Sequence, residues 1–238
     1  MNPDFLIVGG VAALLGAIVQ SSVGLGVGLV ATPIVTMLFP SLMPGTILVV
    51  AAVLPLATLA QEARHAELRG LGWAFGGRVA GTPLGVWLVA AVPARALGIV
   101  IGFFVLAALA VTAWSREVPR NPRTLAAAGA IAGTTGTASG IGGPPIALLY
   151  QRESGPRVRA TLAVFFVAGC LLSLASLAVF GRLPAEQVTA GLALVPFVLV
   201  GFLVAGPLRR YLDAGRLRTA LLIVVGASAI TLIVRNLV

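Results

Sequence analysis

Long apolar segments alternate with short polar connectors along the whole of this chain. The apolar segments occupy residues 5–39, 45–60, 71–92, 96–114, 124–150, 160–180, 188–207 and 219–237. Each can form a helix that crosses all or most of a hydrocarbon core about 30 Å thick. No connector is long enough to hold a separate globular domain. The pattern therefore predicts an all-α polytopic membrane protein with a single transmembrane domain over residues 1–238.

The first and the fifth apolar segments contain a nearly repeated motif. Gly16–Val35 reads GAIVQSSVGLGVGLVATPIV, and Gly129–Ala147 reads GAIAGTTGTASGIGGPPIA, one residue shorter. With a one-residue gap after GAI, the motif pairs Gly24 with Gly136, Gly28 with Gly140, Pro33 with Pro145 and Ile34 with Ile146. Glycines, prolines and hydroxyls interrupt a membrane helix and are tolerated where they line a cavity. A duplicated, broken segment is typical of transporters with internal repeats, here about residues 1–120 and 121–238.

The arginines of the connectors predict how the repeated segments cross the membrane. If all eight segments cross once, these arginines divide almost evenly between the two sides. If the first and fifth segments are hairpins that enter and leave on the same side, twelve arginines share a side with only three opposite. The twelve are Arg64, Arg69, Arg116, Arg120, Arg123, Arg152, Arg157, Arg159, Arg209, Arg210, Arg216 and Arg218. Because cytoplasmic connectors are rich in arginine, the hairpin arrangement is favoured.

The hairpins determine the rest of the expected architecture. Residues 4–39 would form about 54 Å of continuous helix, too long for one straight crossing but suited to two arms joined at the glycines. With six full spans besides, the two hairpins enter from opposite faces. We therefore expect two inverted repeats, each a broken helical hairpin followed by three transmembrane helices. Both termini are expected outside, and the arginine-rich connectors inside.

The two breaks form the predicted binding site. In each hairpin the second arm is expected to begin near Leu29 or Pro144, with Pro33 or Pro145 close to its first turn. A helix N-terminus has unpaired N–H groups and a partial positive charge, so two such ends near the bilayer midplane would attract an anion. Neutral donors and close-approaching glycines would complete the site. Its predicted residues are Gln20, Ser21, Ser22, Gly24, Gly26, Gly28, Thr32, Pro33, Thr134, Thr135, Gly136, Thr137, Ser139, Gly140, Gly142, Gly143, Pro144 and Pro145.

Two features of this site have alternative interpretations. The small residues of the breaks could serve only to pack helices, as in GxxxG interfaces. Arg78, the only charge predicted inside a span, could be a counter-charge for an anion and is included in the candidate site. Alternatively, its side chain could snorkel to the cytoplasmic interface, which its depth in the segment favours.

The composition narrows the function classes. Hydrophobic residues make up 59% of the chain and charged residues 10%, with a formal net charge of +9. Because the cations lie mainly in connectors, their charge is explained by membrane orientation, and we expect no nucleic-acid partner. The apolar segments contain no carboxylate, and the one histidine, His65, lies in a connector. We therefore expect no metal site, no cofactor and no enzyme activity. The single cysteine, Cys170, is expected to be buried and inert.

The paired motifs also resemble those of a known family. Gln20–Pro33, QSSVGLGVGLVATP, and Gly133–Pro145, GTTGTASGIGGPP, each open one half of the chain. They are similar to the motifs of the sulfite exporter TauE/SafE family of membrane permeases, also called the toluene sulfonate uptake permease family. The eight-segment layout matches as well, so the resemblance covers essentially the whole chain. It implies movement of sulfite, sulfonates or related organic anions across the inner membrane of bacteria.

The expected function is therefore export of small anions, with an anionic substrate and the lipid bilayer as partners. A passive anion or small-solute channel is the alternative, because opposed half-helices also build water-type pores. The Asn-Pro-Ala signature of those pores is replaced here by Ala31-Thr32-Pro33 and Gly143-Pro144-Pro145. The sequence leaves open the substrate, the direction, the coupling ion and the oligomeric state.

Overall fold

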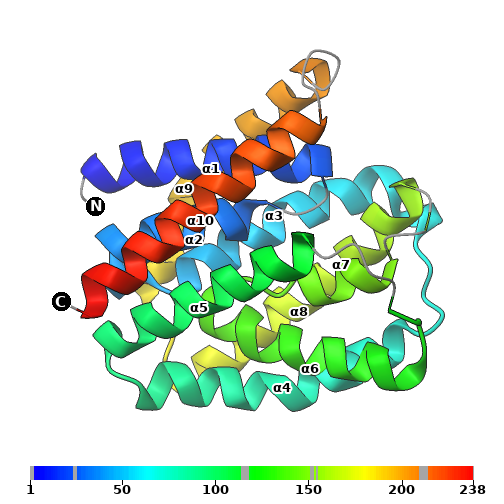
Figure 1. Ribbon diagram of the computed structural model, residues 1–238, viewed down its shortest axis with the longest axis horizontal. Helices are drawn as coiled ribbons and strands as arrows, with labels where there is room; N and C mark the ends of the chain where they lie inside the picture. Colours follow the sequence, from blue (N-terminus) through cyan, green and yellow to red (C-terminus); the bar gives the residue numbers. More distant parts are fainter. Residues whose placement is uncertain are drawn as a thin grey trace.

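The computed structural model describes residues 3–23, 26–113, 118–150, 153, 155–208 and 214–237 (Figure 1). These residues form ten α-helices and two 3-10 helices, η1 (Pro40–Leu42) and η2 (Ala63–His65), with no β-strand among them. The predicted all-helical class is confirmed. The α-helices are α1 (Pro3–Val23), α2 (Val27–Leu38), α3 (Gly45–Glu62), α4 (Leu71–Ala91), α5 (Ala94–Ala113), α6 (Pro122–Ser139), α7 (Pro144–Tyr150), α8 (Gly155–Val179), α9 (Ala185–Leu208) and α10 (Ala214–Leu237).

Five stretches of the described chain are long and apolar enough to cross a membrane. They are Pro3–Ser21, Gly45–His65, Ala94–Ala113, Gly155–Val179 and Ala185–Ala205. Helix α4 is of similar length, but Arg78 and several glycines lower its hydropathy. Most of the long helices lie side by side along the long axis of the molecule (Figure 1).

The two segments that contain the repeated motif each break into two helices. The chain turns back after α1, so that a Cβ built on Gly16 would lie 2.8 Å from the Cα atom of Val27. It turns back again after α6, where a Cβ on Gly142 would lie 2.8 Å from the carbonyl oxygen of Ala132. In both places the second arm therefore packs against the first, and the two breaks form helical hairpins.

The hairpins begin at opposite ends of the molecule. In the first, the rings of Phe5 at the start of α1 and Phe39 just after α2 meet edge to face, 5.2 Å apart. In the second, the Arg120 guanidinium just before α6 lies 4.9 Å from the ring of Tyr150, the last residue of α7. Each hairpin thus starts and finishes at the same end.

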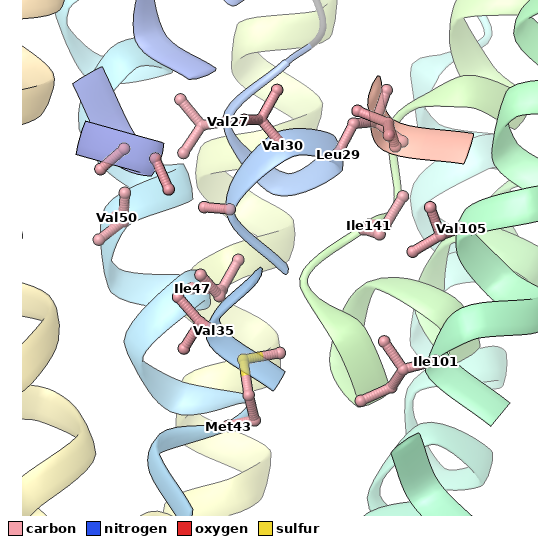
Figure 2. Packing of buried hydrophobic residues seen from close by; sticks show 14 of the residues in the cluster. Val27, Leu29, Val30, Val35, Met43, Ile47, Val50, Ile101, Val105 and Ile141 are labelled. Atoms are coloured by element: carbon pink, nitrogen blue, oxygen red, sulfur yellow. The ribbon is translucent and has the colours of Figure 1, made fainter. Parts of the chain in front are cut away.

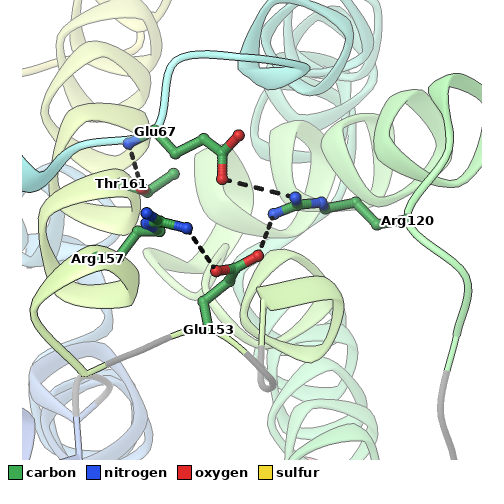
Figure 3. Close-up of polar contacts among 5 residues, drawn as sticks. All are labelled: Glu67, Arg120, Glu153, Arg157 and Thr161. Atoms are coloured by element: carbon green, nitrogen blue, oxygen red, sulfur yellow. Dashed lines mark hydrogen bonds and ion pairs between the residues drawn. The ribbon is translucent and has the colours of Figure 1, made fainter.

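The charged connectors meet at the end where the second hairpin starts (Figure 3). Arg120 pairs with Glu67 at 3.6 Å and with Glu153 at 3.1 Å, and Arg157 pairs with Glu153 at 3.1 Å. The Glu67 amide donates a hydrogen bond to Thr161 Oγ1 at 2.9 Å. Residues 67, 120, 153, 157 and 161 therefore lie together. A single crossing by residues 124–150 would have put Arg120 and Glu153 at opposite ends.

The described ends of the chain lie together at the other end (Figure 1). There Arg95 Nε donates to the Asn236 carbonyl oxygen at 2.8 Å, and Arg235 Nη1 donates to that of Met37 at 3.3 Å. Of the twelve arginines expected together, Arg116, Arg152, Arg209 and Arg210 lie outside the described residues, as do the side chains of Arg216 and Arg218.

Helix α2 is enclosed by the main hydrophobic core (Figure 2). Its residues Val27, Leu29 and Val35 are at most 3% exposed. They pack with side chains of α3, α5 and the second break, among them Ile47, Val50, Ile101, Val105 and Ile141. A broken helix is therefore held deep inside the protein, where its unpaired polar groups need partners other than lipid.

Helices α4 and α6 pack through glycine with almost no side chain between them. A Cβ on Gly77 or Gly81 of α4 would lie 1.9 or 2.0 Å from a carbonyl oxygen of α6, and one on Gly129 of α6 would lie 1.9 Å from that of Ala74. Such contact is possible only for glycine, and the four-residue spacing is that of small-residue membrane interfaces. The pairing brings α6 directly against the backbone that carries Arg78.

The helix contacts of the two halves correspond. Helix α1 packs on α9 as α6 packs on α4, and α3 contacts α9 as α8 contacts α4. Two further pairs, α3 with α8 and α5 with α10, join equivalent helices of the two halves.

The position of the connectors can be tested by thiol labelling in a Cys170→Ser background. Ala66→Cys, Val118→Cys and Ser154→Cys should resist an impermeant thiol reagent added to intact cells, because their connectors share the arginine-rich end. Ala185→Cys, exposed at the opposite end, should react. A difference in labelling between positions 118 and 154 would refute the hairpin at residues 122–150.

Candidate functional site

The two breaks lie against each other inside the protein. A Cβ on Gly28 would lie 2.7 Å from the carbonyl oxygen of Gly140. Thr32 Oγ1 donates a hydrogen bond to the Ser139 carbonyl oxygen at 2.9 Å. This bond gives a partner to one of the carbonyls that every helix leaves unpaired at its C-terminus.

Local chemistry explains where the helices stop. Gly140 follows α6 with a φ of 76°, the left-handed conformation in which glycine commonly ends a helix. A Cβ there would also lie 2.4 Å from a methyl carbon of Ile47. At the first break, Gln20 Oε1 accepts the Val27 amide at 3.0 Å and so caps the start of α2.

The arms differ from the prediction at their N-termini. Helix α7 has seven residues and begins with Pro144 and Pro145, which have no N–H to offer a ligand. Pro33 lies in the interior of α2, beyond the first turn, because that helix already begins at Val27. The two helix starts are therefore not equivalent, and α7 has fewer N–H groups at its start than α2.

A small cavity of about 50 Å³ lies between the breaks. A single water requires about 10–15 Å³ on this measure, so the cavity has room for a few waters or one small oxyanion. The predicted site residues that line it are Gln20, Gly26, Gly28, Arg78, Gly136, Gly140, Gly142, Gly143 and Pro144. Its other lining residues are Leu29, Leu48, Ala51, Ile141, Phe166 and Cys170.

Among the described residues, the predicted hydroxyls do not line this cavity. Most of them donate to backbone carbonyls of the breaks and neighbouring helices, as hydroxyls in membrane helices commonly do. The acceptors are Gly81 for Thr134, Ile141 for Thr135, Thr135 for Ser139 and Ser139 for Thr32, while Thr137 bonds the Ser173 hydroxyl. These hydroxyls support the shape of the breaks.

The remaining predicted residues lie elsewhere. Ser21 lines a neighbouring cavity, and Pro33 and Pro145 are not among the lining residues of the cavity between the breaks. Gly24 and the side chain of Ser22 lie outside the described residues.

Arg78 does not reach the surface, so snorkelling is wrong. Its side chain lies in the interior at 2% relative exposure, and it lines the cavity between the breaks. Its Nε and Nη1 atoms have no hydrogen-bond partner among the described residues. Among the described residues no carboxylate forms an ion pair with it. An unpaired cation in the protein interior is costly unless an anion or water completes its contacts.

The guanidinium of Arg78 occupies a slot built from glycine and an aromatic ring. It lies 4.9 Å from the centre of the Phe165 ring, within cation–π range. A Cβ on Gly169, one turn further along α8, would lie 2.0 Å from its central carbon. Cβ atoms on Gly136 and Gly142 would lie 3.2 Å from Nη2 and Nη1. Glycine at these positions leaves room for the flat group.

The resulting site is suited to an anion. A guanidinium presents several N–H donors in a fixed plane and can donate hydrogen bonds to two oxygens of one oxyanion. Among the described residues, no group of three His, Cys, Asp or Glu side chains could hold a metal ion.

Sequence reasoning missed the contribution of α8. Phe165, Phe166, Gly169 and Cys170 all lie around the guanidinium or the cavity, about 90 residues from Arg78 in sequence. The one available signal was Gly169 itself, a glycine in the middle of an apolar segment, which indicates a close approach. Cys170 is buried, as expected, but it faces the cavity.

Gly169→Ala should displace the guanidinium of Arg78. The added methyl overlaps its central carbon, so we expect destabilisation of about 1–3 kcal/mol and loss of the stabilisation that a bound oxyanion gives. Thermal unfolding of the purified protein with and without sulfite measures both. Gly76→Ala on α4, where a Cβ meets nothing within 4 Å, is the control. Undiminished stabilisation of Gly169→Ala by sulfite would exclude the slot.

The comparison with protein families covers nearly the whole chain. The TauE family model, described as sulfite exporter TauE/SafE, matches residues 9–232, a range that includes both breaks, Arg78 and α8. Neither the curated proteins nor the solved structures gave a match. Together with the long apolar helices, the family match makes this a multi-pass membrane protein involved in transport. The chain belongs to the sulfite exporter TauE/SafE family.

Proposed function

We propose that this protein exports small sulfur-containing or organic anions, such as sulfite or sulfonates, across the bacterial inner membrane. The cavity between the two breaks is the proposed binding site. The observation that carries the proposal is Arg78, a buried cation with two unpaired nitrogens at the wall of a cavity. The family match supplies the substrate class.

The cavity favours a compact substrate. At about 50 Å³ it suits an anion with three oxygens around one central atom, and Arg78 can bind two of those oxygens. The backbone of Gly28 and Gly142 lies at the wall, where a side chain would reduce the space. Leu48 and Phe166 provide apolar surface for an organic substituent in a substrate larger than sulfite.

We propose an inverted-repeat architecture within one domain of residues 1–238. It is supported by the two hairpins that start from opposite ends and by the corresponding helix contacts of the halves. In this arrangement the arginine-rich end faces the cytoplasm and both termini lie outside. Rocking of one repeat against the other would then expose the site to each side in turn.

Arg78 variants test the binding site. Arg78→Gln should lower sulfite uptake into proteoliposomes by about 10- to 100-fold, since hydrogen bonds to a charged group contribute about 1.5–3 kcal/mol. Its unfolding temperature should not fall, because the substitution removes an unpaired buried charge. Arg78→Lys should retain part of the activity, since lysine keeps the positive charge but lacks the planar guanidinium that can donate to two oxygens at once. Arg157→Gln, a surface charge change, is the control. Full uptake by Arg78→Gln would place the substrate elsewhere.

Imposed voltages test the transport mode. An inside-negative membrane favours export of each negative charge by about 2.3 kcal/mol per 100 mV. No histidine or carboxylate is among the residues that line the cavity. Anion flux should therefore follow voltage and survive His65→Ala. A carrier should also show counterflow, with unlabelled sulfite inside the liposomes accelerating entry of labelled sulfite. Flux that does not saturate and shows no counterflow would support the channel alternative.

A further inference from the structure

A second cavity, of about 70 Å³, lies next to the one that contains Arg78. The two cavities share the lining residues Gln20 and Phe166. These two side chains therefore lie between the cavities, and a solute that passes from one cavity to the other must pass them.

Helix α3 lines both cavities in succession. Leu48 and Ala51 face the Arg78 cavity, and Pro55, Thr58 and Glu62 face the second one. Steps of three or four residues keep all five on one face of the helix. This face leads from the Arg78 cavity toward the arginine-rich end, where α3 finishes.

Helix α8 lines the opposite wall in the same way. Cys170 and Phe166 face the Arg78 cavity, and Phe166, Ala163 and Arg159 face the second cavity. Helices α3 and α8 pack against each other, so the two cavities form a row along this pair of helices. At its outer end Arg159 holds Glu62 with two hydrogen bonds, 3.0 Å from Nε and 2.5 Å from Nη2.

The second cavity also contains an unpaired donor. Ser21 is 8% exposed and lines this cavity, and its Oγ has no hydrogen-bond partner among the described residues. Buried hydroxyls are rarely left without a partner, so the orphaned Oγ indicates that a ligand or water completes it. Ser21 is thus a neutral donor in the same cavity as the Arg159 guanidinium.

We propose that this cavity is an access site, at which a small oxyanion binds to Arg159 and Ser21 between the arginine-rich end and Arg78. The inference rests on the proposed function. The anion replaces the Glu62 carboxylate on the guanidinium fork of Arg159. The side chains of Arg159 and Glu62 are 33% and 23% exposed, so water can hydrate the released carboxylate. Glu62 therefore competes with the substrate and sets its affinity at the access site.

Two variants that lose the same ion pair should shift the KM for sulfite in opposite directions. Glu62→Gln leaves Arg159 without a charged competitor and should lower the KM for radiolabelled sulfite about two- to fivefold. Arg159→Gln removes the cation and should raise the KM by a similar factor. Both changes should occur only in membrane vesicles whose arginine-rich end faces the added sulfite. Arg157→Gln, which removes an arginine of the same end that does not line the cavity, controls for surface charge.

The outcomes separate the access site from the proposed function. A purely structural ion pair would move both KM values the same way, or neither, and that result overturns the access site. Equal KM changes in both vesicle orientations overturn it too. If the wild-type protein takes up no sulfite in either orientation, the proposed function fails and the access site fails with it. Opposite shifts in one orientation only support the access site.

Discussion

The structure depends on keeping one guanidinium in the interior without a protein anion beside it. Arg78 could have been neutralised by a carboxylate, but its described surroundings are glycine backbone, the Phe165 ring and a cavity. A buried charge of this kind lowers the stability of the empty protein. Under the proposed function, the same unpaired nitrogens would give the site its affinity, because a bound oxyanion would supply the missing hydrogen bonds. Stability given up in folding would thereby be recovered on binding.

Glycine has two separate roles around that group. Along α4 and α6, Gly77, Gly81 and Gly129 let two backbones touch, which fixes the helix that carries Arg78. Around the guanidinium, Gly136, Gly142 and Gly169 leave the volume that it occupies. Close helix packing is therefore shown for the glycines of α4 and α6, whereas a role in binding for the glycines around Arg78 belongs to the proposed function.

The breaks and hairpins could be predicted because the breaks have a local cause in the sequence and the hairpins follow from a simple count of charges. Glycine and proline interrupt a helix wherever they stand, and the arginine count needs no knowledge of tertiary contacts. The surroundings of Arg78 could not be predicted in this way. Snorkelling was inferred from depth along one helix, whereas burial depends on α6 and α8. Similarly, a hydroxyl such as Thr32 can serve ligand or backbone, and only the meeting of the two breaks decides that it bonds Ser139.

On the proposed route, the two arginines would differ in affinity for an anion, with the higher affinity at Arg78. Arg159 is partly exposed and already paired with Glu62. The net free energy of binding an anion there is therefore only the difference between the anion–Arg159 and the Glu62–Arg159 interactions, which are similar. Arg78 is buried at 2% exposure and has no such competitor among the described residues, so each hydrogen bond it makes to an anion is formed away from water. An anion should therefore rest at Arg78. Release would then require a change in the enclosure of that cavity, which is lined by residues of the two breaks and of α3, α4 and α8.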